Sequence, residues 1–163
     1  MTAAKKIKLT VTLPDGTVDD RTTARTYTHA VYMRTDLVAV RADLAQPRKY
    51  DRENYAHHVK QLEVGVGNSY QYAPKGCKPF TVTVDQARVD TALERLGNCA
   101  TVEEFIAQEI AARLAKHDAE CNGATVSGYL LCGWCGRPDL AEKLRAKTAG
   151  ERFTHDVVIC AVN

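Results

Sequence analysis

Ser127–Val162, SGYLLCGWCGRPDLAEKLRAKTAGERFTHDVVICAV, is the stretch that decides the fold class. Residues 127–134 are mostly apolar and predict a strand, and Pro138 suits the first position of a helix over 139–149. The apolar run over 156–162 fits a strand that is covered on both faces. Strand, helix and strand in this order predict a C-terminal βαβ unit whose two strands are parallel neighbours or near neighbours.

The N-terminal part of the chain predicts antiparallel strands. Apolar and polar residues alternate from Ile7 to Leu13, which is typical of a half-buried strand, and residues 14–16 supply a turn with Pro and Gly. Residues 25–33 are rich in Thr, Tyr and Val and predict a second strand, and residues 37–44 predict a third. These pieces together indicate an antiparallel meander.

The central part of the chain predicts helices. Residues 51–62 carry apolar side chains at helical spacing. Asp85 is placed to cap a helix that ends near Gly97. Residues 101–104 form a capping-box pattern, and the helix that follows is expected to run to about Cys121.

These elements predict one α+β domain over 1–163. Its N-terminal antiparallel strands precede the central helices, and its C-terminal βαβ unit belongs to a mixed sheet. A chain of 163 residues is close to the usual size of one domain. Residues 64–80 contain three glycines and two prolines without a usable period, so we expect a flexible, functional loop there.

Composition limits the class of protein. With 45% hydrophobic and 26% charged residues, the chain has a globular profile. Its apolar runs are too short to span a bilayer and no signal peptide is recognisable, so we expect a cytoplasmic protein without a membrane partner. In a reducing cytosol the cysteines are expected to be free thiols or metal ligands; they are Cys77, Cys99, Cys121, Cys132, Cys135 and Cys160.

The charges are unevenly distributed along the chain. Residues 21–80 hold ten Lys or Arg against five Asp or Glu, and residues 81–163 hold nine against twelve. A basic segment with interleaved tyrosines suits a nucleic acid or the interface with a host protein, although the signs can also mix again in the folded chain. The residues proposed for this surface are Arg48, Lys49, Arg52, Tyr70, Tyr72, Lys75 and Lys78.

Arg25, Tyr27 and His29 share one face of the predicted second strand. Such a trio is suited to contact a phosphate and stack on a base, so these residues join the proposed nucleic-acid or partner-binding surface. They equally suit an acid and a cation in an active site. The alternative without function is an exposed sheet face covered by long polar side chains.

The segment from Cys132 to Arg137 is the sharpest local motif. Cys132 and Cys135 form a CxxC motif that fits a redox pair, two ligands of a zinc ion, or two small buried thiols. The spacing from Cys132 to Arg137 also resembles phosphate-handling cysteine loops. Gly136 and Arg137 precede the predicted helix, where backbone N–H groups and a cation favour a bound anion.

Two short motifs resemble proteins from actinobacteria and their phages. They are Arg21–Val31, RTTARTYTHAV, and Gly133–Ala141, GWCGRPDLA. The resemblance implies an accessory protein of a phage or mobile element. It implies no activity and carries over no functional residue.

The sequence therefore predicts a non-enzymatic binding or accessory protein that engages nucleic acid or a host protein through a basic, Tyr-rich surface. Phosphate-loop, metalloprotease, calcium-loop and nucleophile-elbow motifs do not occur in it. One alternative is a small enzyme that uses Arg25, Tyr27 and His29 with the turn over 132–137. The other is a zinc-binding module; without zinc, no cofactor is expected.

Overall fold

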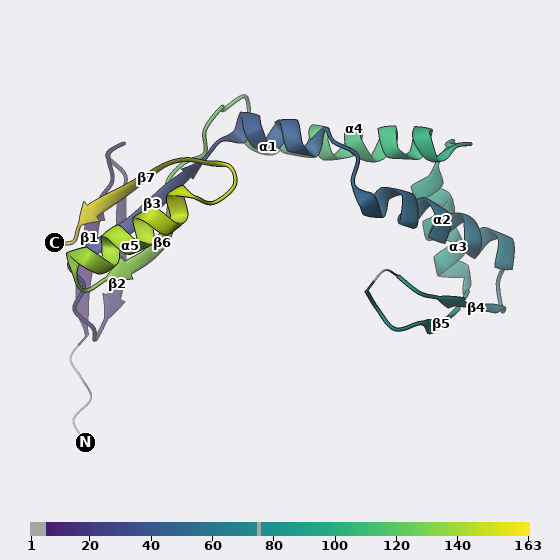
Figure 1. Ribbon diagram of the computed structural model, residues 1–163, viewed down its shortest axis with the longest axis horizontal. Helices are drawn as coiled ribbons and strands as arrows, with labels where there is room; N and C mark the ends of the chain where they lie inside the picture. The colour runs from purple at the N-terminus through teal and green to yellow at the C-terminus, as the bar shows by residue number, and fades with distance from the viewer. Residues whose placement is uncertain (1–5, 75) are drawn as a thin grey trace, which may run out of the picture. The chain divides into compact units, whose positions relative to one another are not determined.

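The computed structural model describes residues 6–74 and 76–163 and has an α+β fold (Figure 1). The chain forms two compact units, one made of the chain up to Arg41 together with Glu120–Asn163 (unit 1), and one made of Ala42–Ala119 (unit 2). The single domain expected from chain length stays a prediction. In chain order the elements are β1 (Ile7–Thr12), β2 (Val18–Thr23), β3 (His29–Thr35), α1 (Leu37–Leu44), α2 (Lys49–Val64), β4 (Ser69–Tyr72), β5 (Phe80–Thr83), α3 (Gln86–Leu96), α4 (Val102–Cys121), β6 (Leu130–Cys135), α5 (Pro138–Ala149) and β7 (Thr154–Ala161).

The main sheet of unit 1 has the strand order β6-β3-β7. β3 runs antiparallel to both neighbours, with His29 opposite Cys135 on one side and Ala161 on the other. β6 and β7 therefore run in the same direction one strand apart and are joined through α5, so the predicted βαβ unit is confirmed with its strands as near neighbours. The predicted mixed sheet is wrong, because β3 lies between them and every hydrogen-bonded pair described is antiparallel.

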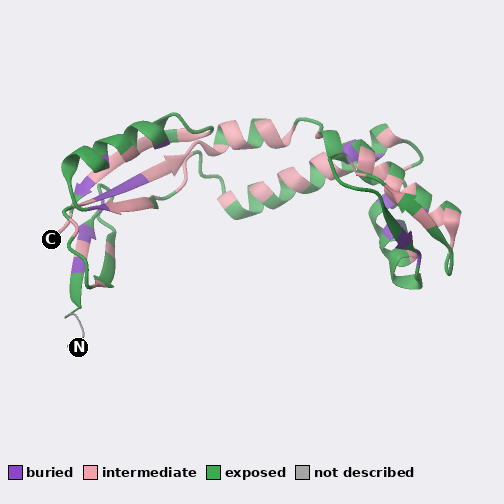
Figure 2. Ribbon diagram, turned by 60° about the horizontal axis from the view of Figure 1, so that its bottom comes forward, coloured by how far each residue is buried: buried purple, intermediate pink, exposed green. Residues whose placement is uncertain are grey.

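Different elements cover the two faces of this sheet. On one face, Val31 and Cys135 pack with Ala141 and Leu144 of α5. On the other face, Tyr32 packs in a cluster with Val11 of the β1–β2 hairpin, and its hydroxyl donates a hydrogen bond to Asp19 at 2.8 Å. Figure 2 shows the buried residues of unit 1 concentrated on β1 and β3.

The N-terminal prediction is only partly confirmed. β1 forms where it was expected and pairs antiparallel with β2, a polar strand over 18–23 that hydrophobic alternation could not reveal. β3 begins at His29 rather than at residue 25 and joins a different sheet. The third strand expected over 37–44 is wrong: the segment is helix α1, because the Asp36 side chain accepts a hydrogen bond from the backbone N–H of Ala39 and caps the helix.

Unit 2 contains the predicted central helices. Asp85 caps α3 by accepting a hydrogen bond from the backbone N–H of Arg88 at 2.8 Å. Glu104 and Thr101 exchange the two hydrogen bonds of the predicted capping box at the start of α4. The buried side chains of this unit include Val82, Val84, Ala92, Leu96, Phe105 and Ile106.

A buried ion pair joins α2 to α4. The Asp51 carboxylate is fully buried and accepts hydrogen bonds from Nη1 and Nη2 of Arg113 at 2.9 and 3.1 Å, and from the backbone N–H of Arg48 at 2.8 Å. Burial by itself would raise the pKa of Asp51, but the hydrogen bonds from Arg113 and Arg48 outweigh it, and the pKa lies below its ordinary value.

The segment over 64–80 contains more regular structure than expected. β4 pairs antiparallel with β5, with Tyr70 opposite Val82 and Tyr72 opposite Phe80. The flexibility expected for the loop stays a prediction, and Lys75 lies outside the described residues. Among the helices of the described residues, none combines the length and the apolar composition needed to cross a bilayer.

Candidate functional site

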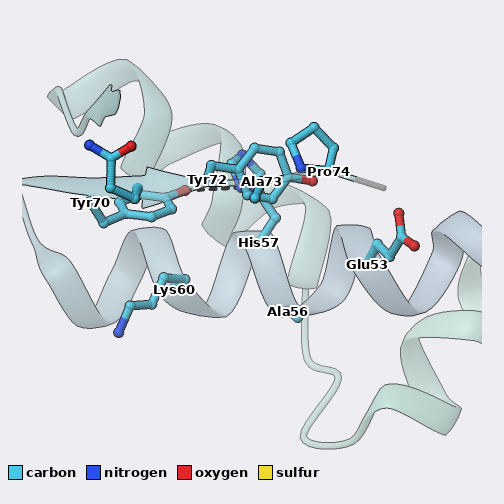
Figure 3. A pocket seen from close by; sticks show the side chains of 9 residues that line it. Glu53, Ala56, His57, Lys60, Tyr70, Tyr72, Ala73 and Pro74 are labelled. Atoms are coloured by element: carbon cyan, nitrogen blue, oxygen red, sulfur yellow. Dashed lines mark hydrogen bonds between the residues drawn. The ribbon is translucent and has the colours of Figure 1, made fainter. Parts of the chain in front are cut away.

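A pocket of about 500 Å³ lies between α2 and β4 in unit 2 (Figure 3). Aromatic rings, small apolar side chains and two opposite charges surround it. Its lining consists of Glu53, Ala56, His57, Lys60, Tyr70, Gln71, Tyr72, Ala73 and Pro74.

Local geometry explains why these side chains meet. On α2, residues 53, 56, 57 and 60 share one face because they are three, four and seven positions apart. Glu53 and Lys60 are consequently separated by about 10.5 Å along the helix axis, at about 1.5 Å per residue. On β4, Tyr70 and Tyr72 are two positions apart and point to the same side, toward α2.

A chain of hydrogen bonds fixes the position of His57. Its Nδ1 lies 2.9 Å from the Tyr70 hydroxyl oxygen, and its Nε2 lies 3.2 Å from Nε2 of the buried Gln61. Because an amide nitrogen only donates, Nε2 of His57 accepts this bond and Nδ1 carries the proton that is donated to Tyr70. Oε1 of Gln61 in turn faces Nδ1 of His58 at 3.4 Å.

The electrostatic surroundings keep His57 neutral. Burial, followed by the nearby charges of His58 and Arg88, lowers the pKa of His57 below its ordinary value. At neutral pH the imidazole is therefore an uncharged ring. Burial also raises the pKa of Tyr70, so that its hydroxyl stays protonated.

The aromatic rings of the pocket support one another. The His57 and Tyr72 ring centroids are 4.2 Å apart, with 42° between the ring planes. Phe80 packs edge-on against Tyr72 at a centroid distance of 5.7 Å. Tyr70 lies 6.0 Å from His57. The rings of His57, Tyr70 and Tyr72 thus form one wall of the pocket, with Tyr72 and Tyr70 tilted by 42° and 51° relative to His57, and the parts of their faces that they do not cover are available to a planar ligand.

The charges around the pocket are polarised. Glu53 lies at the end beside Pro74, and Lys60 lies at the opposite end (Figure 3). Lys60 pairs with Glu63 on the solvent side at 3.2 Å. Arg88 lines a second pocket of about 420 Å³ on the other side of His57, and its charge reaches both His57 and Tyr70. One end of the site therefore carries Glu53, and the other carries Lys60, which Glu63 partly balances, together with the charge of Arg88.

No family model, curated protein or solved structure matches the chain. The geometry of the pocket therefore carries the functional conclusion. The resemblance of Arg21–Val31 and Gly133–Ala141 to actinobacterial and phage proteins stays a prediction.

Two of the tyrosines proposed from sequence lie in the pocket, but the proposed cations do not gather there. Tyr70 and Tyr72 form its wall. Arg48, Lys49 and Arg52 lie at the start of α2 outside the lining, where Arg52 pairs with Glu103 of α4 at 3.5 Å. Lys78 is exposed in the segment between β4 and β5.

The basic segment does not give unit 2 a basic surface. Residues 42–119 hold ten Lys or Arg and eleven Asp or Glu. Two acids of α4 pair with bases of other helices, Glu103 with Arg52 and Glu109 with Arg95. Across unit 2 as a whole the two signs of charge mix, so a site for a polyanion in this unit depends on the local charges around it.

The second proposed group lies in unit 1. Arg25 and Tyr27 precede β3, so the prediction that they share a strand face with His29 is wrong. Tyr27 instead packs on Trp134 of β6 at 6.1 Å, and the guanidinium of Arg21 lies 5.3 Å from the Tyr27 ring. Their role in binding nucleic acid or a partner stays a prediction.

The CxxC motif lies on β6 beneath α5. Cys132 and Cys135 pack among apolar side chains, and burial raises the pKa of both thiols, which favours the protonated form over the thiolate that zinc or redox chemistry requires. Among the described residues, no group of three or more His, Cys, Asp or Glu is placed to hold a metal ion. Zinc binding stays a prediction without a second pair of ligands.

The enzyme and anion predictions concern the neighbouring turn. The structure places the segment before β3 beside this turn, since the backbone N–H of Thr28 donates to the Cys135 carbonyl at 3.0 Å. The Arg137 guanidinium is exposed and pairs with Asp139 in the first turn of α5 at 3.1 Å. The Asp139 carboxylate therefore already pairs with Arg137, the cation that was expected to bind an anion. Anion binding at Gly136 and Arg137 stays a prediction.

Sequence reasoning missed Glu53 and His57 as site residues. The signal that identifies them is their spacing on one face of α2. This face of α2 becomes part of a site only when β4 packs against it. The hydrogen bond between His57 and Tyr70 is a tertiary contact, which spacing along the helix does not predict.

Proposed function

We propose that the protein is a non-enzymatic binding protein for single-stranded nucleic acid, and that the pocket between α2 and β4 takes one nucleotide. The observation that supports this most strongly is the wall formed by His57, Tyr70 and Tyr72, whose rings line an open pocket of about 500 Å³. Bases of single-stranded nucleic acid stack on such aromatic platforms with little dependence on sequence.

The polarity of the pocket matches a nucleotide. A nucleotide carries a phosphate anion at one end and the hydrogen-bonding edge of a flat base at the other. Lys60 and Arg88 supply positive charge at the Tyr70 end, and Glu53 supplies acceptor oxygens at the opposite end. A neutral His57 suits stacking because its ring adds no charge at neutral pH.

The hydrogen bonds around His57 support binding better than catalysis. Both ring nitrogens already have partners in Tyr70 and Gln61, and no described carboxylate orients the ring from behind. A general base requires a free nitrogen within reach of its substrate. The imidazole therefore serves as a wall of the site.

The experiment is a titration of a labelled, mixed-sequence single-stranded oligonucleotide, followed by fluorescence anisotropy at low salt. Loss of a stacking ring costs about 1–3 kcal/mol, so Tyr72→Ala is expected to weaken binding by about 5- to 150-fold. Tyr50→Ala is the matched control, because Tyr50 is exposed and lies outside the pocket lining. Equal affinities of the two variants, with both folded by circular dichroism, contradict the proposal.

A host protein is the second candidate partner, and the β4–β5 sheet favours it. The sheet has two strands among the described residues, so each strand has one edge without a strand partner. An extended segment of another protein binds such an edge through backbone hydrogen bonds. An oligonucleotide that does not bind at low salt would leave this candidate as the better one.

A further inference from the structure

We infer that Glu53 determines which bases the pocket accepts, and that it selects guanine, cytosine and adenine over thymine and uracil. The inference rests on the proposed function, since it names the ligand of the same site.

Most polar groups of the pocket already have protein partners. The Tyr70 hydroxyl contacts His57, the Gln71 amide donates to the Thr81 hydroxyl at 2.7 Å, and the Lys60 ammonium pairs with Glu63. The Glu53 carboxylate makes no hydrogen bond or ion pair with any described residue, although the side chain is half-buried. The Tyr72 hydroxyl is likewise without a described partner. A ligand therefore finds these two groups available.

Position makes Glu53 suitable for contacting the edge of a base. Figure 3 shows its carboxylate on the same side of α2 as Pro74, at the end of the pocket opposite Lys60. A base that stacks on the wall formed by His57, Tyr70 and Tyr72, with its phosphate toward Lys60, directs its outer edge toward Glu53. The residue that meets this edge is an acceptor with two oxygens.

A carboxylate only accepts hydrogen bonds, so it discriminates among bases by the number and position of the N–H donors on their edges. Guanine offers adjacent N1–H and N2–H donors, and cytosine and adenine offer an amino group. Thymine and uracil offer one N3–H between two carbonyl oxygens, and these oxygens repel the carboxylate. A good contact of this kind corresponds to about 5- to 150-fold in affinity between the right and the wrong base.

The experiment compares dodecamers of deoxycytidine and of thymidine on the wild-type chain and on two variants, by anisotropy. The wild type is expected to bind the cytidine oligomer at least about 5-fold more tightly. Glu53→Gln is expected to remove this preference, because its amide presents a donor as well as an acceptor. Glu94→Gln removes the same charge from an exposed position on α3 outside the pocket lining and is expected to keep the preference.

The outcomes separate this inference from the proposed function. Equal binding of the two oligomers by the wild type, or a preference that survives Glu53→Gln, overturns the role of Glu53 while leaving nucleic-acid binding supported. Loss of the preference in both variants overturns it as well, because a general charge effect then explains it. Binding of neither oligomer overturns the proposed function and this inference together.

Discussion

Replacing Arg113 by Met tests how unit 2 holds α2, and with it the pocket. Asp51 in the first turn of α2 is fully buried, and both of its carboxylate oxygens accept hydrogen bonds from the Arg113 guanidinium. Met retains an apolar stem but leaves the carboxylate buried without its counter-charge. Removal of one partner from a buried pair costs about 3–5 kcal/mol, which is a large part of the stability of a small domain.

The assay is urea unfolding followed by far-ultraviolet circular dichroism. The free energy of unfolding falls by about 2 kcal/mol per molar urea, so the loss of stability in Arg113→Met lowers the urea concentration at the unfolding midpoint by roughly 2 M. Trp134, the one tryptophan of the chain, belongs to unit 1, so its fluorescence follows the other unit in the same titration. Arg95→Met is the matched control, because Arg95 of α3 also forms an ion pair with another helix, at 3.8 Å from Glu109 of α4, but its side chain is 61% exposed.

The exposed pair is worth about 0–1 kcal/mol, so the control is expected to stay close to the wild type. Equal midpoints for Arg113→Met and Arg95→Met would refute the reasoning, because the buried pair would then contribute no more than a surface contact. Replacing both Asp51 and Arg113 by apolar residues is expected to recover part of the loss, since no uncompensated charge remains.

Acid unfolding is expected to depend on Asp51, because its pKa in the folded state lies below the ordinary value. The carboxylate contributes its full stabilisation at pH values above the ordinary pKa. This stabilisation is lost as the pH falls through the folded-state pKa. In Arg113→Met the pKa of Asp51 is no longer lowered by the guanidinium, so this stabilisation is expected to be lost at a higher pH. An acid titration followed by circular dichroism measures the pH of unfolding. Oligonucleotide affinity is expected to fall with salt at a slope of about 0.7 in log K per phosphate contact, and Lys60→Ala to reduce the slope by about 0.7; an unchanged slope removes Lys60 from the interface. Cys77 is exposed, whereas Cys135 is buried with a raised pKa, so a thiol reagent is expected to label Cys77 first; equal rates in peptide mass mapping would contradict the burial of Cys135.

Local sequence signals were enough to predict the helices of unit 2 and the βαβ unit. The Asp85 cap, the capping box over 101–104 and the apolar strand followed by Pro138 act within a few residues, so their physical causes are visible in the sequence. The same local reasoning failed for 37–44, where a strand was expected but the cap from Asp36 favours a helix.

Long-range pairing could not be predicted from local patterns. β3 inserts between β6 and β7 through contacts with residues about a hundred positions away, which no periodicity records. The candidate site has the same limitation. Tyr70 and Tyr72 were found because aromatic residues interleave with cations, whereas Glu53 and His57 acquire a role only when β4 packs against α2.

The position of β3 has a consequence for synthesis of the chain on the ribosome. β3 is made before both of its hydrogen-bonded neighbours, and β6 begins at Leu130, 95 positions after β3 ends at Thr35. Unit 2, which is continuous over 42–119, is made in the meantime. At a translation rate of about 5–20 residues per second, β3 waits about 5–20 s for β6.

During that interval the nascent chain displays an unpaired strand whose Ala30, Val31 and Tyr32 are buried in the finished protein. Exposed apolar strands of this kind are what chaperones bind and what other nascent chains pair with. β3 therefore completes its sheet only after β6 and β7 have been translated.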